Sequence, residues 1–308
     1  MQVSSASLLR RLALLQLVAN VGIVITGGAV RLTGSGLGCP TWPKCTTSSY
    51  VTTAARGYHG DIEFGNRLLT WVIGGLAVAC LVVAFSQRRR TGGRTRLRWA
   101  ATVFAGVPAQ AVLGGFTVLT KLNPWLVAAH FLLSIAIITA SYQLWIATRE
   151  RTTAPGPALS GALRTLVALV VAVTVAVLTV GTVVTGSGPH AGDAHAKRTG
   201  LDPATVAQLH ADLVMLLIGL TVALWLALRT TDLARPAGTL LAVELAQGVV
   251  GFTQYFTHLP ILLVGLHMAG ACAVWLAVLN LLTAASARSH RDAPVLHPLD
   301  QARDAISA

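Results

Sequence analysis

Long apolar segments recur along the chain and are separated by shorter polar segments. A helix needs about 20 mostly apolar residues to cross the hydrocarbon core of a bilayer. Eight segments reach that length, and the polar segments between them are too short to form another domain. We therefore predict a single all-α integral membrane domain with eight transmembrane helices, at residues 8–30, 64–86, 97–119, 125–147, 163–185, 205–228, 237–256 and 259–283.

The composition agrees with a membrane protein, since 54% of the residues are hydrophobic and only 11% are charged. Soluble domains carry about a quarter charged residues, so we exclude an ordinary cytosolic enzyme, a disordered chain and a nucleic-acid-binding protein. Lys and Arg concentrate in the cytoplasmic segments of transmembrane proteins, which predicts that both termini are cytoplasmic. On that topology, only seven of the 23 Lys and Arg residues face outward, namely Arg31, Lys44, Arg56, Arg67, Lys121, Lys197 and Arg198.

The chain resembles itself in two halves, residues 1–150 and 151–308. Gln110 and Gln247 lie in matching segments, and each is followed 20 residues later by a histidine. We expect both glutamines to bond across helices. Because each half holds an even number of spans, we predict two tandem four-helix bundles related by a pseudo-twofold axis along the membrane normal, with a polar cytoplasmic tail from about residue 285. The matching segments are 109–117 with 246–253, 75–78 with 219–222, and 26–36 with 181–188.

Three histidines fall within predicted spans at a similar depth, namely His130, His210 and His267. An ionisable residue inside a span is a functional-site hypothesis by default, although a single buried histidine can simply bond a backbone carbonyl. Zinc requires three or four ligands, and a proton relay requires carboxylates, for which only Asp212 is a candidate in the second half. Two imidazoles from facing helices suit a heme iron in a four-helix bundle. We therefore predict that His210 and His267 hold heme b.

The first half differs from the second at the corresponding position. The interval of 144 residues that relates 75–78 to 219–222 places Asn66 opposite His210, so the expected partner of His130 is a weak iron ligand. Glu63 lies one helical turn from Asn66, and it could also be an ordinary interfacial residue paired with Arg67. A half with two strong ligands beside a half with fewer indicates an electron-transfer heme next to an open reactive site.

The four cysteines are of two kinds. Cys80 and Cys272 lie inside spans, where a thiol usually behaves as a small hydrophobe. Cys39 and Cys45 lie in the first outer loop, and on an oxidising face they indicate a disulfide. A metal site is less expected, because no other thiol shares that loop. The sequence leaves open whether the disulfide is structural or redox-active.

Residues 31–45, with their two cysteines, and residues 62–67 resemble the heme A synthase family, whose members convert heme O to heme A for cytochrome oxidase. The resemblance extends over nearly the whole chain. It implies that His210 and His267 ligate a cofactor heme b in the C-terminal half. It also implies that the N-terminal half binds heme O, with His130 as a ligand and Glu63 as the catalytic carboxylate.

The chain departs from the family pattern at Asn66, where the family usually has a histidine three residues after the glutamate. We treat Asn66 as lining the substrate heme site. The substrate iron then has one histidine ligand, or else His59 or water takes the vacant side. Loss of activity is an alternative, although the retained Glu63 and His130 argue against it.

The reaction that the resemblance implies is oxidation of a ring methyl to a formyl group by successive hydroxylations, with water as the oxygen source. Glu63 could stabilise positive charge at the methyl carbon or accept a proton. Electrons would leave through the C-terminal heme b or through the outer cysteine pair, to an unidentified acceptor. The implied setting is a multi-pass protein of the bacterial plasma membrane, with heme sites towards the outer leaflet, a heme O synthase as partner and a homo-oligomer as a compatible state.

Two other classes of protein compete with this interpretation. A membrane b-type cytochrome that passes electrons between quinol and another carrier would share the histidine pair, but it has no use for Glu63. A transporter with a parallel repeat would show broken helices and charged residues near the midplane, which we do not find in the sequence.

Overall fold

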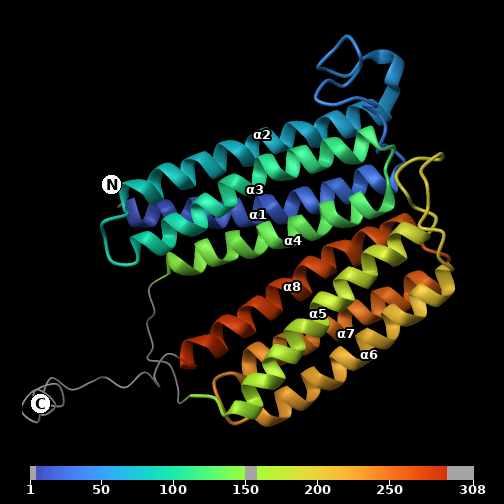
Figure 1. The fold of residues 1–308 in the computed structure, drawn as a ribbon. Helices are drawn as coiled ribbons and strands as arrows, with labels where there is room; N and C mark the ends of the chain where they lie inside the picture. The colour runs from blue at the N-terminus through green and yellow to red at the C-terminus, as the bar shows by residue number, and fades with distance from the viewer. Residues whose placement is uncertain (1–4, 150–157, 290–308) are drawn as a thin grey trace, which may run out of the picture.

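The computed structural model describes residues 5–149 and 158–289, and the polypeptide in these two ranges consists of helices and connecting loops, without a strand (Figure 1). This confirms the all-α prediction. A short 3-10 turn, η1 (Ala54–Arg56), precedes the second of the long helices. The helices are α1 (Ser5–Leu32), α2 (Gly57–Ser86), α3 (Gly93–Leu119), α4 (Pro124–Ala147), α5 (Gly161–Ser187), α6 (Pro203–Leu228), α7 (Ala234–Phe256) and α8 (Ile261–Ser289).

In the described ranges, seven of the eight helices are long and apolar enough to cross a membrane. The remaining helix, α7, has the predicted position but a lower hydropathy, because it carries Arg235, Glu244, Gln247 and Gln254. The protein is therefore an all-α, multi-pass membrane protein. The predicted polar tail begins later than expected, since α8 continues to Ser289, and residues 290–308 lie outside the described part.

The helices pack as two groups of four, which Figure 1 shows one above the other. In the first group α1 contacts α2, α2 contacts α3, α3 contacts α4, and α4 contacts α1. The second group repeats this arrangement with α5, α6, α7 and α8. The two groups meet where α1 and α4 lie against α5 and α8. The predicted boundary at 150/151 falls within residues 150–157, which the structure does not describe.

The largest buried apolar cluster lies across the seam between the two groups. It joins Leu17 of α1 and Ile138 of α4 to Leu178 of α5 and Trp275 of α8. Lipid tails are as apolar as these side chains, so close packing and interhelical hydrogen bonds hold such contacts together. One such bond crosses the seam, where Trp275 Nε1 donates to Thr139 Oγ1 at 2.8 Å.

The two hairpins α3–α4 and α7–α8 turn in the same way. Both Lys121–Leu122 and His258–Leu259 have positive φ angles, between 54° and 63°. The backbone N–H of Leu122 donates to the carbonyl of Thr117 at 2.7 Å, and the N–H of Leu259 donates to Gln254 at the same distance. These left-handed residues also explain why α8 begins at Ile261 and not at the predicted residue 259.

Side-chain caps start α4 and α6, each of which follows a loop at the same end of the molecule. Asn123 accepts a hydrogen bond from the backbone N–H of Trp125 at 3.0 Å, and Asp202 accepts one from Thr205 at 2.8 Å. A proline follows each cap, where its missing N–H costs nothing. Two hydrogen bonds lower the pKa of Asp202. The one from the Thr205 side chain has the larger effect, and the one from the Thr205 backbone N–H has the smaller.

At the same end of the molecule the loops of the two groups are bonded together. Arg31, in the last turn of α1, donates from Nε to the carbonyl of His190 at 2.6 Å and from Nη2 to that of Thr185 at 2.7 Å. The N–H of Gly36 donates to the carbonyl of Gly192 at 2.8 Å. This end of the seam is therefore closed by hydrogen bonds between the two groups.

Candidate functional site

His210 and His267 meet inside the second group of helices. Their ring centroids are 6.3 Å apart and the ring planes are inclined at 70°. Their helices, α6 and α8, are diagonal partners whose backbones do not pack directly against each other in the described part of the chain. The two imidazoles therefore reach across the interior of the group from opposite sides, as the sequence predicts.

Each of these rings packs edge-on against a glycine of the preceding helix. A Cβ added to Gly181 of α5 would lie 3.2 Å from Cε1 of His210, and one added to Gly251 of α7 would lie 3.1 Å from Cε1 of His267. In the first group, Gly114 of α3 stands in the same relation to His130, at 3.0 Å. Only a residue without a Cβ lets the backbone approach this closely.

The two glutamines of the repeated segments fix the same helix pairs. Gln110 Nε2 donates to the backbone carbonyl of His130 at 2.8 Å, and Gln247 Nε2 donates to that of His267 at 2.6 Å. These bonds hold α4 beside α3 and α8 beside α7. The prediction that both glutamines bond across helices is confirmed.

The histidine rings have unused bonding capacity. Nδ1 of His130 and of His267 is buried and has no hydrogen-bond partner among the described residues, whereas the His210 ring has one weak partner, the backbone of Val177. Buried polar atoms almost always have a partner, so these rings are suited to a ligand. No group of three or more His, Cys, Asp or Glu residues that could hold a bare metal ion occurs in the described ranges.

The separation of the His210 and His267 rings suits one metal ion that also has other ligands. A first-row metal bonded to one nitrogen of each ring at about 2 Å would set the centroids about 6 Å apart, close to the observed 6.3 Å. A heme iron needs only such an axial pair, because the macrocycle supplies its other ligands. The residues present therefore fit a heme.

His130 has no comparable partner in the first group. Asn66 lies on α2, and its Oδ1 accepts a hydrogen bond from Thr26 Oγ1 of α1 at 2.7 Å. Its Nδ2 lies near Gly27 of α1, 3.9 Å from the position of an added Cβ. No hydrogen bond joins Asn66 to His130 within residues 5–149. This half thus offers one imidazole and one amide that is oriented by α1.

Glu63 is a buried helical residue and not a loop residue. The helix α2 begins at Gly57, seven residues before the predicted start, so it includes Glu63, which is 6% exposed. The carboxylate accepts hydrogen bonds from Arg67 Nη2 at 2.6 Å and Nε at 3.1 Å. It also accepts the backbone N–H of Cys39 at 2.6 Å. Glu63 therefore faces the loop that carries the cysteine pair.

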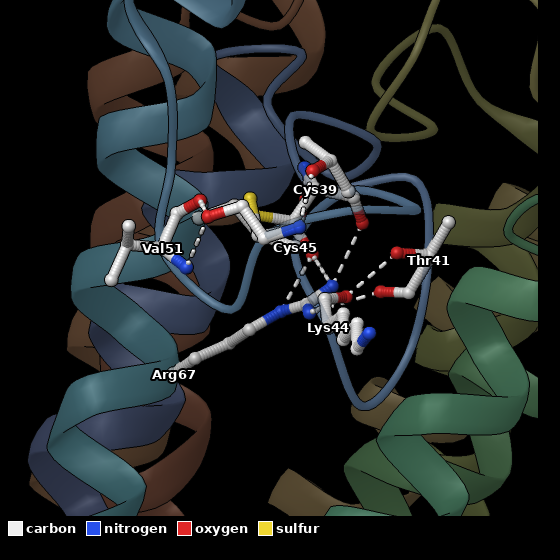
Figure 2. The surroundings of a disulfide bond; sticks show 9 residues. Cys39, Thr41, Lys44, Cys45, Val51 and Arg67 are labelled. Atoms are coloured by element: carbon white, nitrogen blue, oxygen red, sulfur yellow. Dashed lines mark hydrogen bonds and ion pairs between the residues drawn. A yellow bond between two sulfur atoms is a disulfide. The ribbon is translucent and has the colours of Figure 1, made fainter.

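Cys39 and Cys45 form the predicted disulfide, and the loop that they close is fastened to α2. Figure 2 shows Arg67 reaching into this loop, where it donates to the carbonyls of Cys39 at 2.8 Å, Thr41 at 3.0 Å and Lys44 at 3.2 Å. Cys80 and Cys272 are free and buried, as expected.

The same loop also covers α3, since the ring of Trp42 lies against Gly115, next to the glycine that contacts His130. The sequence interpretation missed this contact, as it missed the glycines that face the histidines. Only the repetition of Gly114 and Gly251, each 16 residues before a histidine, could have identified those glycines.

His59 lies on α2, because the helix includes Gly57 and Gly60. Its Nδ1 is 2.9 Å from Ser35 Oγ of the loop after α1. His59 is two turns from Asn66, which is about 10 Å along the helix. His59 is therefore held at the end of α2 and not beside Asn66.

Comparison with known proteins agrees with these observations. Residues 10–279 match the COX15-CtaA family model, described as "Cytochrome oxidase assembly protein". The chain is 32% identical over 130 residues to proteins named "Heme A synthase" from Geobacillus thermodenitrificans and Geobacillus kaustophilus, covering 42% of this chain and 39% of each relative. It is 26% identical over 147 residues to the "Heme A synthase" of Shewanella oneidensis, covering 44% of both. The matched segments thus span less than half the length of these relatives. The family model, in contrast, covers most of the chain, and the chain therefore belongs to the COX15-CtaA family of cytochrome oxidase assembly proteins.

Proposed function

We propose that this protein is a heme A synthase, an oxidoreductase that converts the ring methyl of heme O to a formyl group. The observation that carries the proposal is the difference between the two groups of helices. One group presents the His210–His267 pair across its interior. The other presents only His130, together with the buried carboxylate of Glu63. The names of the similar proteins point to the same activity.

The proposed architecture is a pair of four-helix halves, residues 1–150 and 151–308, related by a pseudo-twofold axis along the membrane normal. The matching hairpins, glycine–histidine contacts and glutamine bonds support this symmetry. We include α7 as an eighth span, since its 23 residues make it long enough, at 1.5 Å per residue, for a hydrocarbon core of about 30 Å.

In the C-terminal half, His210 and His267 would hold a cofactor heme b. When bound there, heme supplies one-electron transfer at a potential tuned by its ligands and surroundings. The contribution of the protein is to hold both imidazoles edge-on against Gly181 and Gly251, so that little reorganisation is needed on binding. This half is the exit for electrons.

In the N-terminal half, His130 would bind the iron of the substrate, heme O. Asn66 lines the opposite side, with its amide oriented by Thr26. A weak ligand at this position leaves the substrate iron less tightly held than a cofactor. That difference is appropriate for a molecule that must enter and leave at each turnover.

Glu63 would act on the methyl group that is oxidised. Conversion of a methyl to a formyl group with one water releases four electrons and four protons, so positive charge develops at the carbon before water adds. A fixed carboxylate can stabilise that charge or accept a proton. Arg67 and the N–H of Cys39 hold the Glu63 carboxylate in one position, which is the preorganisation that such a role requires.

The proposed setting is the bacterial plasma membrane, with both termini cytoplasmic and the histidines towards the outer leaflet. A heme O synthase would supply the substrate, and a separate acceptor would take the electrons. The bonded outer loops, closed by Arg31, would then cover the heme sites on the external side.

The proposal is tested by expressing the protein in cells that make heme O but lack a heme A synthase of their own. Hemes extracted from the membranes are separated by chromatography. We expect heme A in these cells and none in cells with an empty vector. Heme O left unchanged, beside heme b bound to the protein, would overturn the proposal and favour a b-type cytochrome that only carries electrons.

A further inference from the structure

A buried carboxyl group lies inside the second group of helices, and the proposed reaction does not use it. Glu244 of α7 is 3% exposed, and its Oε1 accepts a hydrogen bond from Thr221 Oγ1 of α6 at 3.0 Å. Its Oε2 has no partner among the described residues. The sequence interpretation named only Asp212 as a carboxylate for this half. Asp212 is instead exposed on α6 and bonded to Gln208.

Glu244 lies on the same face of α7 as Gly251, and Thr221 lies on the same face of α6 as His210. Glu244 precedes Gly251 by seven residues and Thr221 follows His210 by eleven, and both intervals are close to whole helical turns. The Thr221–Glu244 pair therefore lies in the interior of the group, about 10 Å along α7 from the glycine that contacts His267. It is on the side away from the outer loops.

The first group has an apolar pair at the corresponding positions. The repeat intervals place Val107 opposite Glu244 and Ala77 opposite Thr221. Ala77 and Val107 belong to one apolar cluster with Val103 and Ala140. This bundle architecture therefore folds without a polar pair at this site, so the pair in the second group calls for a functional explanation.

An ionised carboxylate in such a place needs a compensating charge, because an isolated charge in an apolar interior is costly. The titratable groups on the helices packed against α7 are His210 and the exposed Asp212 of α6, and His267, Cys272 and Arg288 of α8. No hydrogen bond or ion pair joins any of them to Glu244. Arg235 lies at the far end of α7, and Arg288 of α8 is paired with Asp232. The protein thus offers Glu244 no fixed counter-charge among the described residues.

The proposed cofactor would itself supply a charge that depends on its redox state. A ferric heme with two neutral imidazoles carries one net positive charge on its core, and a ferrous heme carries none. We propose that Glu244 is a redox-linked proton site, oriented by Thr221, for the heme held by His210 and His267. This inference rests on the proposed function.

The exchange balances in charge. Glu244 is an ionised carboxylate when the iron is ferric, and it takes one proton from water when the iron gains one electron. It returns that proton when the electron passes to the acceptor. Glu244 would thereby keep the interior of the bundle neutral through each of the electron transfers that oxidation of the substrate methyl requires.

The test is the midpoint potential of the heme in the purified holoprotein as a function of pH, with dithionite as reductant and ferricyanide as oxidant. In the wild type we expect the potential to fall as the pH rises. The double variant Thr221→Ala/Glu244→Val copies the pair that the first half already accommodates. We expect it to bind the same amount of heme with a potential that no longer depends on pH. Asp212→Asn, at an exposed carboxylate of the same bundle, should retain the wild-type dependence.

A second readout reports on the carboxyl group directly. In the reduced-minus-oxidised infrared spectrum, the wild type should gain a carboxylic acid C=O band that is missing in Glu244→Gln. A pH dependence or a C=O band that survives in the Glu244 variants would overturn the inference. A heme-loaded wild type with a pH-independent potential would overturn this inference alone, whereas a wild type that binds no heme at His210 and His267 would overturn the proposed heme site as well.

Discussion

The rings of His210 and His267 lie 6.3 Å apart between centroids, although they belong to helices on opposite sides of a four-helix group. Each ring is held against a backbone glycine, and the carbonyl of His267 is bonded to Gln247. The arrangement is therefore set by the packing of four helices and not by a bond between the two rings. A ligand that bridges them would find both imidazoles already in place.

The glycine contact predicts that Gly251→Ala weakens heme binding. The new methyl group would lie 3.1 Å from Cε1 of His267, so the ring must move away from its position. We expect about a tenfold loss of heme affinity, which corresponds to about 1.4 kcal/mol. The measurement is the rate of heme transfer from the purified protein to an excess of apomyoglobin.

Gly248→Ala is the matched control for this variant. Gly248 is on the same helix, and an added Cβ there meets nothing within 4 Å among the described residues. It should keep the wild-type affinity. Equal losses in Gly248→Ala and Gly251→Ala would show that the helix, and not the ring contact, is responsible.

The asymmetry of the two halves predicts the effect of Asn66→His. A histidine on α2 would give His130 a strong partner and make the first half resemble the second. We expect the variant to retain a second heme with a low-spin optical spectrum after purification, where the wild type retains one. Quantification of heme per polypeptide together with the optical spectrum checks this. An unchanged heme content would argue against the placement of the substrate site between α2 and α4.

The role of Glu63 predicts that Glu63→Gln stops turnover without loss of the cofactor. The amide keeps an oxygen for the N–H of Cys39 but loses the negative charge. We expect heme A formation to fall by about 100-fold or more, a typical cost of removing one electrostatic stabiliser, at constant heme b content. Asp61→Asn, at an exposed carboxylate on the same helix, should remain active. Normal heme A production by Glu63→Gln would remove the catalytic role.

The loop closed by Cys39 and Cys45 predicts a local loss of order when the disulfide is removed. In Cys39→Ser/Cys45→Ser, the closed loop loses a cross-link worth about 2 kcal/mol for a ring of this length. Three carbonyls bonded to Arg67 then become free to move. We expect faster tryptic cleavage after Lys44, with the helices intact by circular dichroism. Unchanged cleavage would mean that the Arg67 bonds alone hold the loop.

Much of the fold could be predicted from the sequence, because apolar segments of membrane length directly specify helices. The predicted segments fall within or near the observed helices, and α2, α3, α4, α6 and α7 end at the predicted residues. The disulfide and the glutamine bonds were also predictable. The pairing of His210 with His267 was predictable as well, because both histidines lie at a similar depth in predicted spans of the same half.

Other parts of the site depend on contacts that no local pattern encodes. The start of α2 at Gly57 was missed because its first residues are polar and include two glycines, which are weak helix formers. The pairing of Glu63 with Arg67, four residues away, follows from helix geometry, but its second partner is a backbone N–H 24 residues earlier in the chain. Glu244 was overlooked because the search for carboxylates followed the depth of the histidines, whereas its importance comes from its burial beside Thr221.

Oxidation of heme O to heme A can be measured directly on the purified protein. The purified protein is loaded with heme b, kept in detergent, and incubated with heme O and a chemical one-electron acceptor. The hemes are then extracted and separated by chromatography. We expect heme A that increases with time and with the amount of protein, and none with His130→Ala. Heme O recovered unchanged from a protein that still holds and cycles its heme b would show that the protein is not a heme A synthase.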